Sequence, residues 1–344
     1  MKFTQTLCFD DVLIRPRYSD IFSRKDIDVS VNFGQGIQLG IPIISSPMDT
    51  VTESSMASAM SFLGGLGIIH RYNSPSQQAQ LVADACGLVK RDHTPNIGFA
   101  VGVGEDMLER VRKCIAAGAN AICIDIAHGH HTLMRHTLRV LRNTFGDDIH
   151  IIAGNVATLE GFNDLADWGA NSIRVGIGGG SICSTRIQTG HGMPTFQSTL
   201  DCSRSDRDAN LIADGGIRNS GDIVKCLAAG ADAVMIGSLL AGTTESPGEM
   251  QRIDDRNVKV YRGMASKDAQ IDWRGHYASV EGVTSYVECR GPVGNVVAEL
   301  ENGIRSGLSY SGCTSIAEFQ SRAEFVQQSP LGQKESNTHI FDRK

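Results

Sequence analysis

The run NLIADGGIRNSGDIVKCLAAGADAVMIG, residues 210–237, decides the fold. It opens with a short apolar stretch, 210–214, and closes with another, 232–237. Both are rich in Ile, Val and Ala on both faces, as in parallel strands that helices cover. The segment between them ends in AAGAD, where a glycine just past a helix supplies the left-handed conformation that terminates it. The run therefore predicts a strand, a helix and a second strand of an α/β protein.

The same unit recurs along the chain. Amphipathic segments such as 105–117 and 131–144 separate the apolar runs, and the glycine turn returns as AAGAN and DWGAN. Eight units of this kind predict a (β/α)8 TIM barrel that takes up residues 1–344 as one domain. An open doubly wound sheet is the alternative, which the lack of G-x-G-x-x-G after the first strand weakens. The six earlier apolar runs are 42–46, 66–70, 97–103, 120–126, 149–154 and 172–176, and helical segments near 292–305 and 314–325 precede a polar tail, about 328–344.

Composition excludes several classes of protein. Of 344 residues, 41% are hydrophobic and 20% are charged, which excludes a disordered chain. The net charge of -6 gives no broad electrostatic footprint for nucleic acid. No apolar run approaches the roughly 20 residues that span a bilayer, and the first residues lack a signal-peptide pattern. Nine irregularly spaced cysteines with no C-x-x-C indicate reduced thiols, so we expect a cytoplasmic protein without membrane or nucleic-acid partners.

A glycine-rich loop follows the sixth predicted strand. VGIGGGSICSTR, residues 175–186, opens a predicted catalytic loop at about 177–196. Three successive glycines let backbone amides approach an anion, and Ser181 adds a hydroxyl. Cys183 is a candidate nucleophile, because loop amides or a nearby base can stabilise its thiolate. The alternative is a glycine-rich turn with an incidental thiol.

Polar residues mark the ends of other predicted strands. Asp214 with Gly216 follows the seventh strand, and Gly237 with Ser238 follows the eighth, a frequent phosphate site in such barrels. The alternative for these glycines is a role in starting helices. Asp125 and Asn155 end the fourth and fifth strands, where they contact a ligand or only hold a loop.

Two further segments invite a chemical role. HGHH, residues 128–131, matches no standard zinc spacing. The insertion at about 245–290 is predicted to be a mobile flap. Its Arg274, His276, Tyr277 and Glu281 deliver acid–base groups if the flap closes, although solvated charges are the default.

At these residues the chain resembles the IMP dehydrogenase / GMP reductase family, over nearly its whole length. The motifs occur in the family's order, which makes the resemblance specific. They are FDDVLIRP at 9–16, PMDTVTE at 47–53, GLGIIHR at 65–71, IDIAHGH at 124–130, IIAGNVAT at 151–158, VGIGGGSICSTR at 175–186, IADGGIR at 212–218, MIGSLLAG at 235–242, YRGMAS at 261–266 and GIRSGLSYSG at 303–312. The family's fold is a (β/α)8 barrel that usually forms homotetramers.

The resemblance implies a role for each matched residue. Cys183 is the implied nucleophile toward C2 of the purine, with Thr185 and Glu281 in proton transfer. A monovalent cation, K+, is implied at a subunit boundary, held by Gly178, Gly180 and Cys183 together with Glu335 and Ser336. The implied substrate-binding residues are Ser46, Met48, Asn155, Ser181, Asp214, Gly216, Gly237, Ser238, Tyr261, Gly263 and Met264, and the implied cofactor-binding residues are Asp125, Ala127 and His128.

The resemblance allows two reactions. We expect a GMP reductase, which uses NADPH to convert GMP to IMP and ammonia through a covalent thioimidate on Cys183. No CBS regulatory domain is present, since only residues 71–96 separate the second and third strands, and Arg274 and Tyr277 are not the adjacent Arg-Tyr pair of dehydrogenase lids. The alternative is an IMP dehydrogenase that uses NAD to make XMP, which PMDTVTE, GIIHRYN and Lys334-Glu335-Ser336 favour.

Two other classes of protein stay open on the residues alone. A non-catalytic nucleotide-binding barrel would have no use for the thiol of Cys183. An isomerase or aldolase barrel would need a lysine or an acid–base pair at strand ends, and no lysine lies in any of the eight runs.

Overall fold

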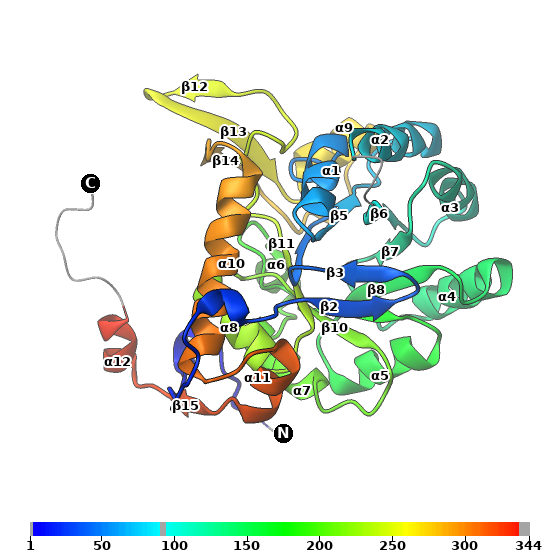
Figure 1. Ribbon diagram of the computed structural model, residues 1–344. Coiled ribbons are helices and arrows are strands. Elements are labelled where there is room, and N and C mark those ends of the chain that lie inside the picture. Colours follow the sequence, from blue (N-terminus) through cyan, green and yellow to red (C-terminus); the bar gives the residue numbers. More distant parts are fainter. Residues whose placement is uncertain (1–2, 90–93, 337–344) are drawn as a thin grey trace.

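The computed structural model describes residues 3–89 and 94–336. Its centre is a closed barrel of eight parallel strands in chain order, with the last strand paired to the first (Figure 1). The prediction of a (β/α)8 barrel is confirmed, and all eight apolar runs form its strands. The strands are β4 (Ile43–Ser45), β5 (Leu66–Ile69), β6 (Ile97–Val101), β7 (Ala121–Asp125), β8 (His150–Val156), β9 (Ser172–Val175), β10 (Asn210–Asp214) and β11 (Ala233–Ile236).

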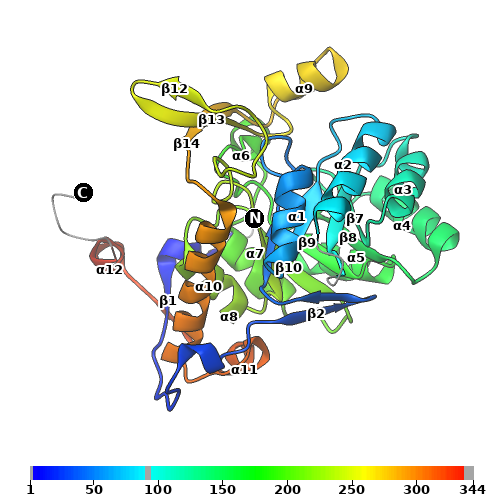
Figure 2. The same cartoon turned by 45° about the horizontal axis from the view of Figure 1, so that its top comes forward.

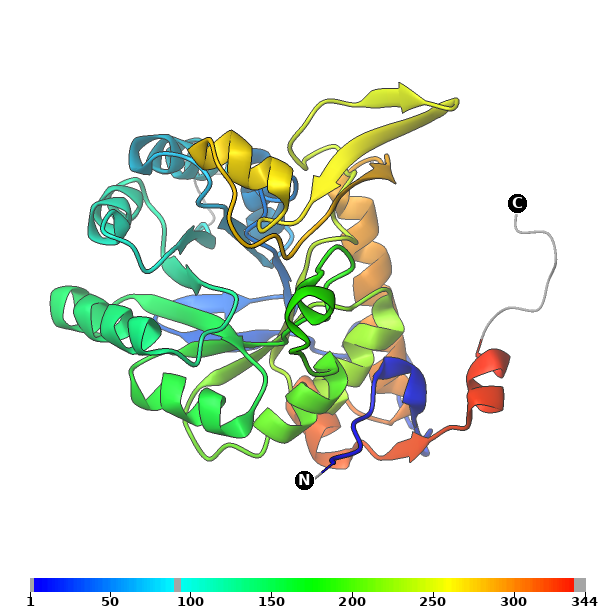
Figure 3. The same ribbon diagram turned by 180° about the vertical axis from the view of Figure 1, so that it is seen from behind.

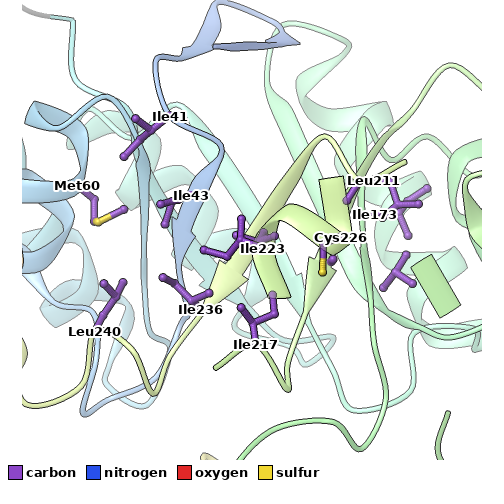
Figure 4. Packing of buried hydrophobic residues seen from close by; sticks show 14 of the residues in the cluster. Ile41, Ile43, Met60, Ile173, Leu211, Ile217, Ile223, Cys226, Ile236 and Leu240 are labelled. Carbon is purple, nitrogen blue, oxygen red and sulfur yellow. The ribbon is translucent and has the colours of Figure 1, made fainter. Parts of the chain in front are cut away.

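Helices cover the outside of the barrel and bury its outward-facing apolar side chains. Figure 4 shows one such contact, where Ile223 of a helix lies toward Ile43 and Ile236, and Cys226 of the same helix lies toward Ile173 and Leu211. Gly118, Gly169 and Gly230 end three helices at φ of +108°, +108° and +105°, which confirms the predicted glycine turns. The helices around the barrel are α1 (Ser54–Phe62), α2 (Pro75–Leu88), α3 (Met107–Ala116), α4 (Thr132–Phe145), α5 (Leu159–Asp167), α7 (Thr195–Cys202), α8 (Ser220–Ala228) and α10 (Val293–Tyr310).

A hairpin seals the end of the barrel at which the strands begin. Strands β2 (Val31–Gly34) and β3 (Ile37–Leu39) join Phe33, Ile37 and Leu39 to the apolar residues that fill the barrel interior. Phe33 stacks on the ring of His150, with centroids 5.6 Å apart, and His150 is fully buried. The interior is therefore a packed core, and only the opposite end, where the strands finish, is left for a site.

The flap predicted at 245–290 is a small folded unit above that opposite end (Figure 2). Strands β12 (Gln251–Ile253), β13 (Arg256–Arg262) and β14 (Thr284–Glu288) form an antiparallel sheet, and α9 (Lys267–Arg274) lies between the last two in the chain. Lys259 is buried and donates to the carbonyls of Thr243 and Ser246 at 3.0 and 2.7 Å, which ties β13 to the segment after β11. The prediction of a mobile flap did not include this sheet, because its strands expose most of their side chains and lack a long apolar run.

The N-terminal and C-terminal segments of the described chain pair with each other in a short sheet. Strand β1 (Val12–Ile14) pairs with β15 (Phe325–Gln327), and part of the predicted polar tail forms a short helix, α12 (Pro330–Glu335). No helix in residues 3–89 and 94–336 is long and apolar enough to cross a membrane. The remaining short elements are η1 (Phe9–Asp11), η2 (Arg24–Asp26), α6 (Thr185–Thr189) and α11 (Ile316–Arg322).

Candidate active site

Two adjoining cavities open where the barrel strands end. The larger, of about 320 Å³, lies between the loops after β4, β7, β8, β9 and β10 and the flap. The smaller, of about 80 Å³, lies at the ends of β10 and β11. Ser46, Met48, Asp214 and Tyr261 line both, so the two cavities are parts of one elongated site.

The loop that carries Cys183 is clasped by the flap. The backbone of Ser184 donates to the carbonyl of Glu281 at 2.9 Å, and the backbone of Val283 donates to the carbonyl of Ile182 at 3.0 Å. Gly263 and Gly282 lie so close that a side chain on either would crowd the other's Cα at 3.3 Å. The flap therefore forms one wall of the site and carries Glu281 to it.

Three reactive side chains follow one another across this contact. The sulfur of Cys183 lies 3.2 Å from the hydroxyl of Thr185, which donates to a carboxylate oxygen of Glu281 at 2.8 Å. Ser279 donates to the other oxygen of Glu281 at 3.3 Å. A thiol beside a hydroxyl that is itself bonded to a carboxylate can attack an electron-poor carbon and pass a proton to or from the group that departs.

A buried arginine joins the two aspartates at the strand ends. Arg174, on β9, contacts Asp125 at 2.6 Å and Asp214 at 2.8 Å, and the amide of Asn155 also donates to Asp214 at 2.8 Å. Burial by itself would lower the pKa of Arg174, but the carboxylates of Asp214 and Asp125 outweigh this and raise it well above its usual value. Both aspartates face the cavity beside this guanidinium, and a carboxylate in that place can accept hydrogen bonds from a sugar diol.

The smaller cavity has the character of an anion site. Gly215 and Gly216 have φ of +89° and +76°, a conformation that turns their backbone toward the glycine-rich loop before Cys183. The hydroxyl of Tyr261 lies 3.5 Å from that of Ser181, and burial raises the pKa of Tyr261. Hydroxyl groups and glycine backbone around a small cavity are suited to a phosphate.

Most of the residues singled out from the sequence meet here. The larger cavity is lined by Ser46, Met48, Asp125, Ala127, Asn155, Gly178, Gly180, Cys183, Thr185, Asp214, Tyr261, Gly263, Met264 and Glu281. Ser181, Gly216, Gly237 and Ser238 line the smaller one. The structure thus brings these side chains together, while the roles that the resemblance assigns to them stay predictions.

A few predicted residues lie elsewhere. His128 is outside both linings, with its ring 6.5 Å from that of His130, and its pKa is lowered by burial and by the neighbouring histidines. Glu335 and Ser336 lie at α12, which contacts η1 rather than the Cys183 loop, so one chain does not complete the predicted cation site. Within the described ranges, no three His, Cys, Asp or Glu side chains form a group that suits a metal ion.

The other flap residues proposed as acid–base groups do not reach the cavity. Arg274 donates to the side chain of Gln270 and to the carbonyl of His276, and the ammonium of Lys267 lies 4.9 Å from the ring centre of Tyr277. Of the four flap residues considered, Glu281 is the one that lines the site.

Among the charged and aromatic residues of the cavity wall, sequence reasoning missed three. Arg174 organises both aspartates, and its only signal was a charge inside the otherwise apolar run SIRVG. Arg71 and Tyr72 line the larger cavity, with the Nε of Arg71 at 3.8 Å from Asp125. Both belong to IIHRYN, a segment that was noted for its resemblance without a role for either residue.

The fold and the site together define a class of protein: a (β/α)8 barrel with a cysteine on the wall of an elongated cavity at the ends of its strands. The sequence profile of the IMP dehydrogenase / GMP reductase domain matches residues 6–339. The chain belongs to this family of purine nucleotide oxidoreductases.

The named relatives include both IMP dehydrogenases and GMP reductases. The inosine-5'-monophosphate dehydrogenase of Cryptosporidium parvum is 37% identical, over 97% of this chain and 94% of the relative. That of Nitrosopumilus maritimus is 33% identical over 98% and 99%, in an alignment of 472 positions that therefore includes segments this 344-residue chain lacks. The GMP reductase of Leishmania major is 32% identical over 98% and 97%.

A solved structure covers the whole fold. The crystal structure of a cysteine-to-alanine variant of GMP reductase from Trypanosoma brucei, in complex with guanosine 5'-monophosphate, matches with a TM-score of 0.92. It is 31% identical in sequence, and 99% of each chain is covered.

Proposed function

We propose that this protein is a GMP reductase, which converts GMP to IMP and ammonia at the expense of NADPH. The contact between Glu281, Thr185 and Cys183 carries the proposal, because it places a proton-transfer pair beside the nucleophile. Arg274 and Tyr277, the types of residue that dehydrogenase lids use to activate water, are separated in the sequence and engaged elsewhere on the flap. The Trypanosoma brucei structure, a GMP reductase with bound GMP, supports a purine nucleotide as substrate.

The proposed chemistry balances on the residues present. As the sulfur of Cys183 adds to C2 of the guanine, the thiol proton passes through Thr185 to Glu281, and this pair then delivers it to the 2-amino group, which leaves as ammonia. This leaves a thioimidate in which the sulfur is bonded to C2. A dihydronicotinamide cofactor, when bound, would supply a hydride to C2, and the carbon–sulfur bond would then break to return the thiolate and release IMP. Asp214 would hold the ribose of the nucleotide, and the glycines and hydroxyls of the smaller cavity its phosphate.

The cofactor side of the cavity fits a dinucleotide in its chemistry. Asp125 faces the cavity with a carboxylate that can hold a second ribose diol, and Ala127 and Arg71 lie beside it. We propose NADPH rather than NADH as the donor, and a comparison of initial rates with the two cofactors tests this choice.

The competing function is an IMP dehydrogenase, which oxidises IMP to XMP with NAD. The relatives that are 33% and 37% identical carry that name, which is the observation in its favour. Absorbance at 340 nm separates the two functions. One cuvette holds enzyme, GMP and NADPH, and the other holds enzyme, IMP, NAD and potassium. We expect the signal to fall in the first cuvette, with ammonia released in equal amount. A rise in the second with no change in the first would make the protein a dehydrogenase, and silence in both would favour a nucleotide-binding barrel without this activity.

We also propose a homotetramer whose neighbouring subunits complete a potassium site. Gly178, Gly180 and Cys183 belong to the loop after β9. Glu335 and Ser336 lie at α12, which packs against η1 in the same chain, so a second copy would have to supply them to this loop. Light scattering gives the mass in solution, and activity in potassium chloride against sodium chloride gives the ion requirement. A monomer, or equal activity in both salts, would contradict this assignment.

A further inference from the structure

The flap also contacts the barrel through a pair of aromatic rings, neither of which belongs to the Cys183, Thr185 and Glu281 group. Trp273, near the end of α9, stacks on Tyr72, which follows β5, with ring centroids 4.3 Å apart and planes 9° from parallel. The guanidinium carbon of Arg71 lies 5.6 Å from the centre of each ring. Arg71 and Tyr72 are cavity residues, so the stack joins a flap helix directly to the wall of the site.

Glu281 and α9 belong to one hydrogen-bonded unit. Gln270, on α9, is buried and its side-chain amide donates to the carbonyls of Ala265 at 3.0 Å and Ser279 at 2.9 Å. Its amide oxygen accepts from the backbone of Ala278 at 3.2 Å. The backbone of Glu281 donates to the carbonyl of Ala265 at 3.1 Å. The position of α9 therefore fixes that of the Glu281 carboxylate.

A second tie holds the same helix by charge. Arg262, on β13, contacts Asp49 after β4 at 2.6 Å and Asp272 on α9 at 2.6 Å. Arg262 lies between Tyr261 and Gly263, which line the cavity, so changes at Arg262 disturb the nucleotide site itself. Trp273 is outside the larger cavity and 37% exposed, which makes its stack the contact that can be removed cleanly.

We propose that Trp273 is a positioning residue for the proton-transfer step: its stack on Tyr72 holds the flap closed, so that Glu281 meets Thr185 beside Cys183. The inference rests on the proposed function, in which this contact carries the departure of ammonia. Without the stack, the flap unit loses its contact on the β5 side and spends more time away from Thr185. Asp214 and Ser238 lie on the barrel, and Tyr261 lies on β13, which Lys259 ties to the barrel, so nucleotide binding is expected to persist.

Kinetics separate a positioning role from a structural one. Trp273→Ala is expected to lower kcat by about 3- to 10-fold, the range for loss of an aromatic pair, and to leave KM for GMP within about twofold. Trp273→Phe, which keeps a ring, is expected to restore most of the rate. Tyr286→Ala is the matched control, since Tyr286 is a half-exposed aromatic residue on β14 of the same flap. Wild-type kcat in Trp273→Ala, an equal loss in Trp273→Phe, or a melting temperature that falls with the rate would overturn the proposal.

Fluorescence tests the stack without reference to activity. The chain has two tryptophans, so Trp168→Phe leaves Trp273 as the sole reporter. Adding Tyr72→Leu to that variant is expected to expose the indole and increase quenching by acrylamide, and unchanged quenching would show that the rings do not stack in solution. If the parent protein turns over neither GMP nor IMP, the proposed function fails, while the quenching result still decides whether the flap is held by this contact.

Discussion

The barrel and the flap are built on opposite physical plans. The barrel is a closed parallel sheet whose strands are buried on both faces, and its inner and outer apolar clusters leave almost no strand residue exposed. The flap is a three-stranded antiparallel sheet, drawn in yellow and orange, that extends beyond the barrel (Figure 3). Its strand β12 is exposed throughout, and β14 is exposed at all but one residue. Packing over many apolar residues holds the barrel together, whereas Lys259, Arg262 and Trp273 attach the flap by a few polar and aromatic contacts.

The residues of the candidate active site are divided between the barrel and the flap. Cys183, Asp125 and Asp214 lie on loops and strand ends of the barrel, whereas Glu281 lies on the flap. A segment with few buried contacts opens at lower free-energy cost than a closed barrel does. Changes in the barrel should therefore alter binding or the proposed nucleophile, and changes at Glu281 or α9 of the flap should alter proton transfer while binding persists.

Removal of the barrel's nucleophile should give the largest effect. In Cys183→Ala no covalent adduct can form, so turnover should fall by at least about 10⁴-fold. The affinity for GMP, measured by calorimetry, should change little, because ribose and phosphate contacts remain. Cys289→Ala, at another partly buried thiol outside the cavity, should turn over normally. Turnover retained in Cys183→Ala would refute the role of this thiol.

Substitution of Glu281, the flap carboxylate, should give the second largest effect. Glu281→Gln keeps a hydrogen-bond partner for Thr185 but cannot take up or supply a proton, so ammonia release should slow by about 10²- to 10⁴-fold. Rapid-quench assay of ammonia and stopped-flow absorbance of the cofactor distinguish this step from hydride transfer, which should slow less. Equal slowing of both steps, or a large loss of GMP affinity, would contradict the division between flap and barrel.

A barrel carboxylate should matter mainly for binding. Asp214→Asn removes the charge that would accept the ribose hydrogen bonds, and a charge-assisted bond contributes about 1.5–3 kcal/mol, or roughly 10- to 100-fold in KM for GMP. Arg174 keeps its contact with Asp125, so the variant should still fold. Asp167→Asn, at an exposed carboxylate on α5, is the control. An unchanged KM would remove Asp214 from the ribose site.

The smallest effect should be on the stability of the barrel at low pH. Burial, and secondarily Arg142, lower the pKa of His150 from its usual 6.5 to about 4. The unfolded chain therefore takes up a proton before the folded one does, and stability is lost as the pH falls from about 6.5 toward 4.

Urea unfolding at pH 7.5 and pH 5 measures this loss. Wild-type protein should lose on the order of 2 kcal/mol more than His150→Gln between the two pH values. The variant cancels the contribution of carboxylates, which titrate in both proteins. Equal pH dependence of the two would mean that His150 is protonated inside the barrel, or that this end of the barrel opens readily.

Most of the barrel and much of the site were predictable from the sequence. Runs that are apolar on both faces of a strand, and the glycine turns at Gly118, Gly169 and Gly230, are local signals. Each run predicted a strand, and each glycine turn predicted the end of a helix. The ends of eight parallel strands must meet at one rim, so Asp125, Cys183 and Asp214 were expected together. The flap's sheet was not predictable, because β12 and β14 are short and exposed and carry no apolar periodicity.

The sequence by itself determined the order of the eight strands, the loop that bears Cys183 and the family to which the motifs belong, because these depend on patterns within a few residues of each other. The tertiary structure decided which distant side chains pair. Arg174 bridges aspartates 49 and 40 positions away, and Trp273 stacks on a ring 201 positions before it. Such contacts depend on barrel closure and on the direction in which the flap folds back, and local periodicity carries no record of either.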